Sequence, residues 1–126
     1  MDEAAVAPSV LVIGLDPYRV PGPWDPKPVA DGIEAGRASF VEQDVAVEFC
    51  LFGLDGSDDV ETVVTEALTA QAWDCVVVGG GVRHDLLLFE RVINLVHRHA
   101  AAACIAFNAD PEGTYDAAAR WLEPLG

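Results

Sequence analysis

The chain has 126 residues, of which 52% are hydrophobic; seven are lysine or arginine and 21 are aspartate or glutamate. This length suits one domain with a core of normal size, and the apolar share argues against intrinsic disorder. The net charge of −14 argues against nucleic acid and anionic membrane surfaces as partners, because the chain repels phosphate groups. No apolar stretch approaches the ~20 residues that cross a bilayer. Residues 1–9 contain no basic residue, unlike a targeting signal, so we expect a cytoplasmic protein.

Strand and helix patterns alternate along the chain. Residues 10–15 form an apolar run that Asp16 and Pro17 end, which is typical of a strand buried on both faces. Further strands are predicted over residues 45–54, 75–78 and 102–107, and helices over residues 29–43, 60–72, 86–101 and 114–123. The sequence therefore predicts a single α/β domain over residues 1–126, with residues 1–8 as a flexible N-terminal segment. We expect about four βα units in a shortened flavodoxin-like (Rossmann-like) parallel sheet with strand order 2-1-3-4.

The three cysteines of the chain are expected to be structural. Each cysteine lies in or at the start of a predicted strand, and none forms a C-x-x-C pair; the three are Cys50, Cys75 and Cys104. We interpret them as small buried residues in a reducing compartment, with a nucleophile or metal ligand as the alternative.

Polar residues stand before two of the predicted helices. Ser57 or Asp58 is expected to cap the second helix and Asp85 the third.

A proline-rich segment follows the first strand. Residues 17–28 hold five prolines together with Tyr18, Arg19 and Trp24. Connections between a strand and a helix usually take about 2–6 residues, so a loop of this length suggests a functional, lid-like element. Tyr18 and Trp24 either close over a bound ligand or pack the loop onto the domain.

The most unusual segment is the run Gly79, Gly80 and Gly81 after the third strand, followed by Arg83, His84 and Asp85. Glycines between a strand and a helix let the backbone come close to a ligand. With strand order 2-1-3-4, ligands are expected in the crevice beyond strands 1 and 3. The glycine segment and residues 17–28 are therefore expected to face each other across one pocket.

Two residues at this crevice are candidates for proton transfer. Asp16 ends the first strand, where acidic side chains often serve as general acids or bases, although an Asp-Pro pair can also simply end a strand. His84 titrates near neutral pH when unperturbed, although it could also be an exposed residue leading into the helix.

Other residues are expected to bind the ligand. Arg83, Arg19 and the amides of Gly80 and Gly81 suit an anionic group, with solvated charge or a salt bridge as the alternative for each arginine. Asn108 and Asp110 end the fourth strand and are expected to line the outer edge of the crevice, with Asp55 as a similar peripheral candidate.

Several motifs are missing. The glycine run lacks the third glycine of a dinucleotide fingerprint, and the chain has no phosphate-binding P-loop and no G-x-S-x-G. The histidines also lack the spacing of a zinc site. We therefore expect no cofactor and no metal, with a carboxylate-bound Mg²⁺ at Asp16 and Asp55 as the alternative. The size and acidity are similar to those of response-regulator receiver domains, but Gly79 stands where that family carries its phosphorylated aspartate.

We therefore expect a small cofactor-independent enzyme of lyase, isomerase or hydrolase type, acting by acid–base chemistry on a small polar or anionic metabolite. One alternative is a non-catalytic module that binds a small ligand or regulates another protein. Another is a homodimeric interaction protein, because the predicted helix that contains Phe89 is apolar over a wider face than one sheet requires.

Overall fold

The structure is a computed structural model, and it describes residues 8–122. Its four strands are β1 (Ser9–Leu15), β2 (Ala46–Phe52), β3 (Cys75–Val78) and β4 (Cys104–Phe107). They form one parallel sheet in the order β2-β1-β3-β4, which confirms the predicted α/β class and strand order. Residues 1–7 of the segment expected to be flexible lie outside the described residues.

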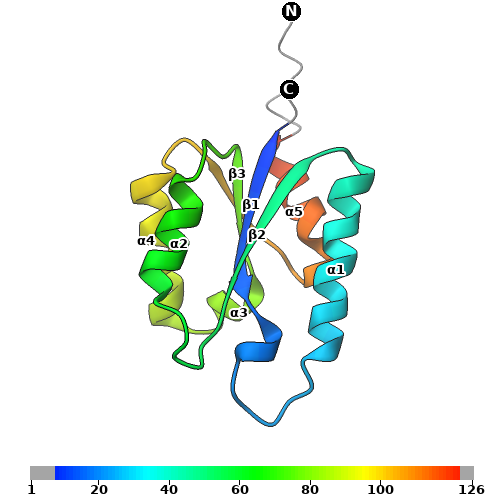
Figure 1. Cartoon of the computed structure of the whole chain (residues 1–126). Helices are drawn as coiled ribbons and strands as arrows, with labels where there is room; N and C mark the ends of the chain where they lie inside the picture. The colour runs from blue at the N-terminus through cyan, green and yellow to red at the C-terminus, as the bar shows by residue number, and fades with distance from the viewer. Residues whose placement is uncertain (1–7, 123–126) are drawn as a thin grey trace, which may run out of the picture.

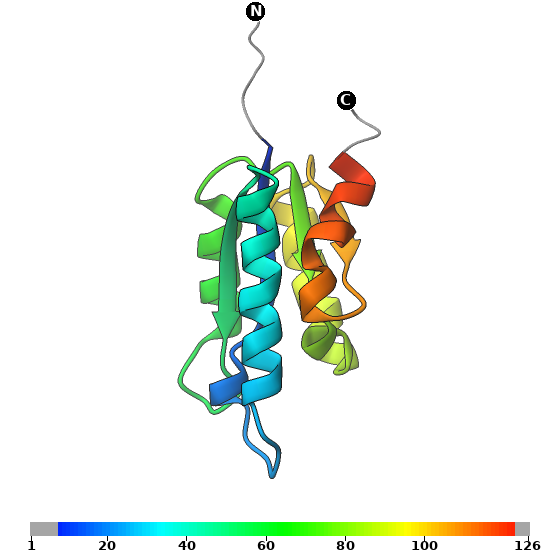
Figure 2. The ribbon, with the colours of Figure 1, turned by 90° about the vertical axis from the view of Figure 1, so that its right-hand side faces the viewer.

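Helices cover both faces of the sheet. One face carries α1 (Lys27–Glu42) and α5 (Thr114–Leu122), and the other carries α2 (Val60–Thr69) and α4 (Leu86–His99) (Figure 1). Figure 2 shows α1 and α5 side by side in front of the sheet. No helix among the described residues is long and apolar enough to cross a membrane.

Alternating side chains of the strands build a core on each face. Leu11 and Ile13 of β1 pack toward α2 and α4, whereas Val10 and Val12 pack toward α1 and α5. Both faces of the central strands are therefore covered, and all four residues of β3 are fully buried. A continuous apolar run is what a strand in this position requires.

The strands end together at one edge of the sheet. Leu15 pairs with Phe52, Ile13 with Val78, and Val78 with Phe107. The residues that follow the four strands are consequently brought to the same edge, at the bottom of Figure 1. These residues are Asp16, Gly53, Gly79 and Asn108.

The glycine segment differs from the turn that the sequence predicts. Gly80–Arg83 form a single helical turn, α3, with Gly79 as its N-cap residue. Backbone hydrogen bonds from Arg83 N to Gly79 O (3.3 Å) and from His84 N to Gly80 O (3.1 Å) hold this turn. The long helix α4 then begins at Leu86, with Asp85 as its N-cap; Asp85 Oδ1 accepts a hydrogen bond from Leu88 N, which confirms the predicted cap.

Two other local expectations need correction. The N-cap residue of α2 is Asp59, not Ser57 or Asp58. The Asp58 carboxylate accepts hydrogen bonds from Gly53 N and Arg19 and is thereby held outside the helix. The proline-rich loop is also shorter than its 12 predicted residues, because Pro17–Arg19 form a 3-10 helix and α1 already begins at Lys27.

The glycines in α1 have a packing role. A Cβ at Gly36 would lie 2.3 Å from the carbonyl oxygen of Pro111, and a Cβ at Gly32 would lie 3.0 Å from the carboxylate of Glu112. Both partners belong to the 3-10 helix η3 (Pro111–Gly113), which leads into α5. These two glycines therefore let α1 approach the loop after β4 closely.

Candidate functional site

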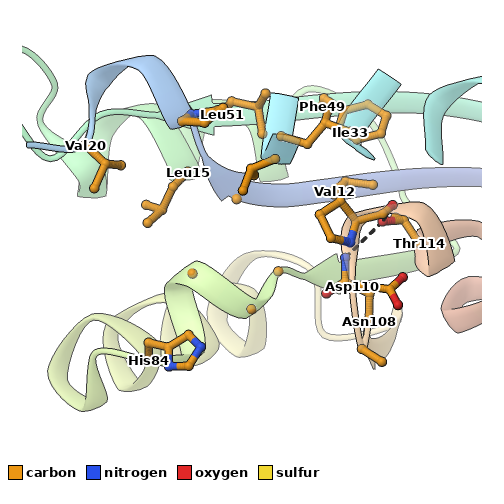
Figure 3. Close-up of a pocket in the computed structure, with 18 of the residues that line it drawn as sticks. Val12, Leu15, Val20, Ile33, Phe49, Leu51, His84, Asn108, Asp110 and Thr114 are labelled. Carbon is orange, nitrogen blue, oxygen red and sulfur yellow. Dashed lines mark hydrogen bonds between the residues drawn. The ribbon is translucent and has the colours of Figure 1, made fainter. Parts of the chain in front are cut away.

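A cavity of about 380 Å³ lies at the carboxyl edge of the sheet (Figure 3). Its apolar wall comes from Val29 and Ile33 of α1, Phe49 and Leu51 of β2, and Val12 of β1. This wall continues the core layer between the sheet and α1. Cavities of this size and character commonly hold small molecules.

Gly14 of β1 helps to keep this space open. Its position lines the cavity, and a Cβ there would lie 3.4 Å from Leu51 Cδ2. A larger side chain at this position would extend from the sheet surface into the cavity, since alternate residues of a strand point to the same face.

The proline-rich loop forms a second wall. Pro17, Val20 and Trp24 line the cavity, and Trp24 Nε1 donates a hydrogen bond to the carbonyl oxygen of Val20 (3.1 Å). This bond fixes the indole to its own loop. Tyr18 does not line the cavity, and 65% of its surface is exposed.

The glycine segment forms a third wall, so the two segments expected to face each other do line one cavity. Gly79, Gly80 and Gly81 all contribute to the lining. A Cβ at Gly81 would lie 2.8 Å from Cδ1 of Leu15, whereas at Gly80 the nearest atom would be Arg83 Nη2 at 3.6 Å. An added Cβ at Gly80 would therefore make only an ordinary contact.

The polar side chains of the lining come from the residue after α3, from the loop after β4 and from the start of α5. Asn108 Nδ2 donates to Thr114 Oγ1 (2.9 Å), and the Thr114 hydroxyl donates to the carbonyl oxygen of Pro111 (2.7 Å). Asp110 Oδ1 accepts a hydrogen bond from Gly113 N (2.7 Å). His84 is exposed, and its imidazole has no hydrogen-bond partner among the described residues.

Asp16 belongs to an ion-pair network outside the cavity lining. Its Oδ1 accepts a hydrogen bond from Tyr18 N, and its Oδ2 lies 3.0 Å from Arg19 Nε. Arg19 Nη1 also lies 2.6 Å from Asp58 Oδ2. Hydrogen bonds from Gly53 N and then from Arg19 lower the pKa of Asp58. Hydrogen bonds to the carboxylates of Asp16 and Asp58 raise the pKa of Arg19.

Arg83 joins the ends of β3 and β4. Its guanidinium donates to the carbonyl oxygens of Val78 (2.6 Å) and Asn108 (2.5 Å), and it lies 5.5 Å from the ring centroid of Phe107. Burial lowers the pKa of Arg83. Neither Arg83 nor Arg19 lines the cavity.

The structure thus divides the candidate residues into two groups. Those that line the cavity are Trp24, Gly79, Gly80, Gly81, His84 and Asn108. Those that lie outside its lining are Asp16, Tyr18, Arg19 and Arg83.

The apolar wall of the cavity was not predicted from the sequence. Val29 and Ile33 are four residues apart, as neighbours on one helix face are, and Phe49 and Leu51 alternate along β2. These patterns also describe ordinary core residues, and only the fold places them beside the glycine segment. Asn108 and Asp110, expected at the outer edge of the crevice, are both part of the lining, whereas Asp55 is not.

The described residues offer neither a metal centre nor an activated thiol at this cavity. No three of their histidine, cysteine, aspartate and glutamate side chains gather in a way that could hold a metal ion. Burial raises the pKa of Cys50 to about 11 and that of Cys75 to about 12, so both thiols are protonated at neutral pH. No cysteine lines the cavity.

Comparisons of the sequence with known proteins give no match, either to a family model or to a curated protein. What the cavity can bind therefore has to be inferred from its lining residues.

Proposed function

We propose that this protein binds a small molecule with a largely apolar body in the cavity between α1, the sheet edge and the glycine segment. The main support is that backbone lines the cavity at Gly79 and Gly80, where an added Cβ would make only ordinary contacts. The two loops expected to form a pocket both contribute to this lining.

The glycines at this wall are not required by backbone conformation. Among the described residues, only Gly22 and Gly56 are glycines with positive φ. Gly79 has a φ of −75°, and Gly80 lies in a helical turn. Any residue adopts these conformations, and glycine costs about 0.5–1 kcal/mol relative to alanine inside a helix. Close approach of a ligand gives a reason for glycine at position 80 that packing does not.

Acid–base catalysis in this cavity is a second candidate, and His84 is the residue that supports it. Its imidazole lines the cavity and makes no hydrogen bond to any described residue. The carboxylate of Asp16, the expected partner in proton transfer, is already bound to Tyr18 N and Arg19. This difference favours binding over the paired Asp16–His84 mechanism.

Binding can be tested with a neutral probe and NMR spectra of the ¹⁵N-labelled protein. We expect 3-phenylpropan-1-ol to shift the amide signals of Gly79–Gly81, Ala109 and Thr114, all of which belong to the lining. Shifts confined to α4, or no shift at millimolar concentrations, would contradict the proposal. Loss of the shifts in His84→Ala would indicate that the imidazole contributes to binding.

Self-association through α4 is a further candidate. A shallow groove between α4 and the edge strand β4 is lined by Phe89, Ile93, Ile105 and Phe107, and the rings of Phe89 and Phe107 lie 5.6 Å apart. A second copy of the chain would cover these apolar side chains. We expect Phe89→Glu to convert a dimer into a monomer in sedimentation velocity, whereas Leu87→Glu, on the exposed side of α4, should not. A monomeric wild-type protein at high concentration would rule out the dimer.

A further inference from the structure

The cavity differs from the anion site that the sequence suggests. No lysine or arginine among the described residues lines it. The cations nearest in sequence to its walls already have partners: Arg19 binds Asp16 and Asp58, and Lys27 Nζ lies 2.7 Å from Asp31 Oδ2. The Arg83 guanidinium is held by backbone carbonyl groups. An anionic ligand would therefore find no free cationic side chain of arginine or lysine in the lining.

In contrast, the lining contains a carboxylate that can accept a hydrogen bond from a cationic ligand. Asp110 lines the cavity, and its Oδ1 accepts the hydrogen bond from Gly113 N. No described residue donates a hydrogen bond to its other oxygen, Oδ2. A carboxylate forms stronger hydrogen bonds with a cationic donor than with a neutral one.

The remainder of the lining suits an apolar group. Besides the aliphatic side chains, it includes the aromatic rings of Trp24 and Phe49. In Figure 3, Phe49, Leu51 and Ile33 lie across the cavity from Asp110 and Asn108. A ligand that fills this space therefore meets apolar atoms on one side and a carboxylate on the other.

The net charge of the whole chain also favours a cationic ligand over an anionic one. A net charge of −14 raises the local concentration of cations around the protein and lowers that of anions. The field and the lining therefore favour the same sign of ligand charge.

We infer that the ligand is an apolar amine, an aromatic or aliphatic body carrying a protonated nitrogen, with Asp110 as its counter-ion. This inference rests on the proposed binding function and assigns its ligand class. It replaces the anionic metabolite suggested by the sequence with a cationic one.

Three probes of nearly equal size separate these possibilities: 3-phenylpropylamine, 3-phenylpropan-1-ol and 3-phenylpropionate. Titration of the full-length protein, followed by NMR, should give the tightest binding for the amine and the weakest for the carboxylate. Asp110→Asn should weaken amine binding by about tenfold, because it removes a charge-assisted hydrogen bond, and should leave the alcohol nearly unchanged. Asparagine also caps helices well, so the local turn is expected to persist.

Asp116→Asn is the matched control, because it removes the same charge from an exposed position on α5 outside the cavity. It should retain the amine preference. Equal or tighter binding of 3-phenylpropionate, or an amine preference that survives Asp110→Asn, would overturn the ligand class while leaving the binding function intact. If none of the three probes bound to the cavity, both the ligand class and the proposed function would be wrong.

Discussion

The guanidinium of Arg19 lies 2.6 Å from the carboxylate of Asp58, across the carboxyl edge of the sheet. Its Nε lies 3.0 Å from Asp16, so one arginine joins the end of β1 to the loop before α2. About one third of the Arg19 side chain is exposed. This network explains why Asp16 is absent from the cavity lining although it directly follows β1.

We therefore predict that Asp16→Asn lowers the stability of the protein without weakening ligand binding. The variant should have a lower midpoint of thermal unfolding, because Arg19 loses a charged partner, but 3-phenylpropan-1-ol should bind as it does to the wild type. Thermal denaturation and NMR titration measure the two effects, with the exposed Asp116→Asn as a control. Abolished binding in a folded Asp16→Asn protein would place this carboxylate at the ligand after all.

The close approach of α1 to η3 gives a second prediction. Gly36→Ala should reduce the free energy of unfolding by about 1–3 kcal/mol, since its Cβ would lie 2.3 Å from a backbone oxygen that cannot move alone. Gly32→Ala should cost less, because its Cβ would meet the movable carboxylate of Glu112. Urea denaturation of both variants measures the difference. Equal stability of the two would contradict this packing.

The network around Arg19 also predicts how stability depends on pH. The pKa of Asp58 is below its usual value of 3.8, mainly because Gly53 N donates to its carboxylate. The pKa of Asp55 is lowered by hydrogen bonds from Ser57. Near pH 4 and below, the unfolded chain therefore binds more protons at these groups than the folded chain, so acid reduces stability.

Asp58→Asn should lose less stability than the wild type when the pH falls from about 5 to about 3, because one of these groups is missing. Asp31→Asn, at an exposed position on α1, is the control. Urea denaturation at the two pH values gives the comparison. An unchanged acid response in Asp58→Asn would mean that this carboxylate does not couple protonation to folding.

The raised pKa values of Cys50 and Cys75 predict slow reaction with thiol reagents. Both side chains are buried, and the protonated thiol is a poor nucleophile. Alkylation by iodoacetamide, followed by mass spectrometry, should modify these residues only as fast as the protein opens. Rapid modification of Cys50 in the native protein would show that it is accessible and activated.

The fold was predictable because its signals are local and repeated. Residues 10–15 and 75–78 are continuous apolar runs, which identify buried parallel strands, and turn residues separate each strand from the next helix. The cap at Asp85 follows from side-chain chemistry within four residues. Even so, α3 was not predicted, because three glycines in a row resemble a turn more than a helix.

The location of the site could be predicted from the sequence, but the side chains that line it could not. Strand order brings the loop after β1 and the glycine segment to one edge, but which side chains face the cavity depends on distant partners. Asp16 is occupied by Arg19, which is in turn oriented by Asp58, 39 residues later. Gly32 and Gly36 likewise look like weak points of a helix until η3 is placed against them.

The glycine at position 80 offers the sharpest test of ligand binding in the cavity. An added Cβ there would meet only Arg83 Nη2, at 3.6 Å, so alanine should fit. Alanine should also raise the free energy of unfolding by about 0.4–1 kcal/mol, because it reduces the conformational entropy of the unfolded chain. Leucine at the same position should extend into the cavity. We therefore expect ligand binding to weaken in the order Gly80, Gly80→Ala, Gly80→Leu, without a loss of stability.

The decisive measurement is the NMR titration of wild type, Gly80→Ala and Gly80→Leu with 3-phenylpropan-1-ol, beside their thermal unfolding. We expect progressive loss of binding with unfolding midpoints equal to or above that of the wild type. Undiminished binding by a folded Gly80→Leu protein would show that the ligand does not occupy this cavity.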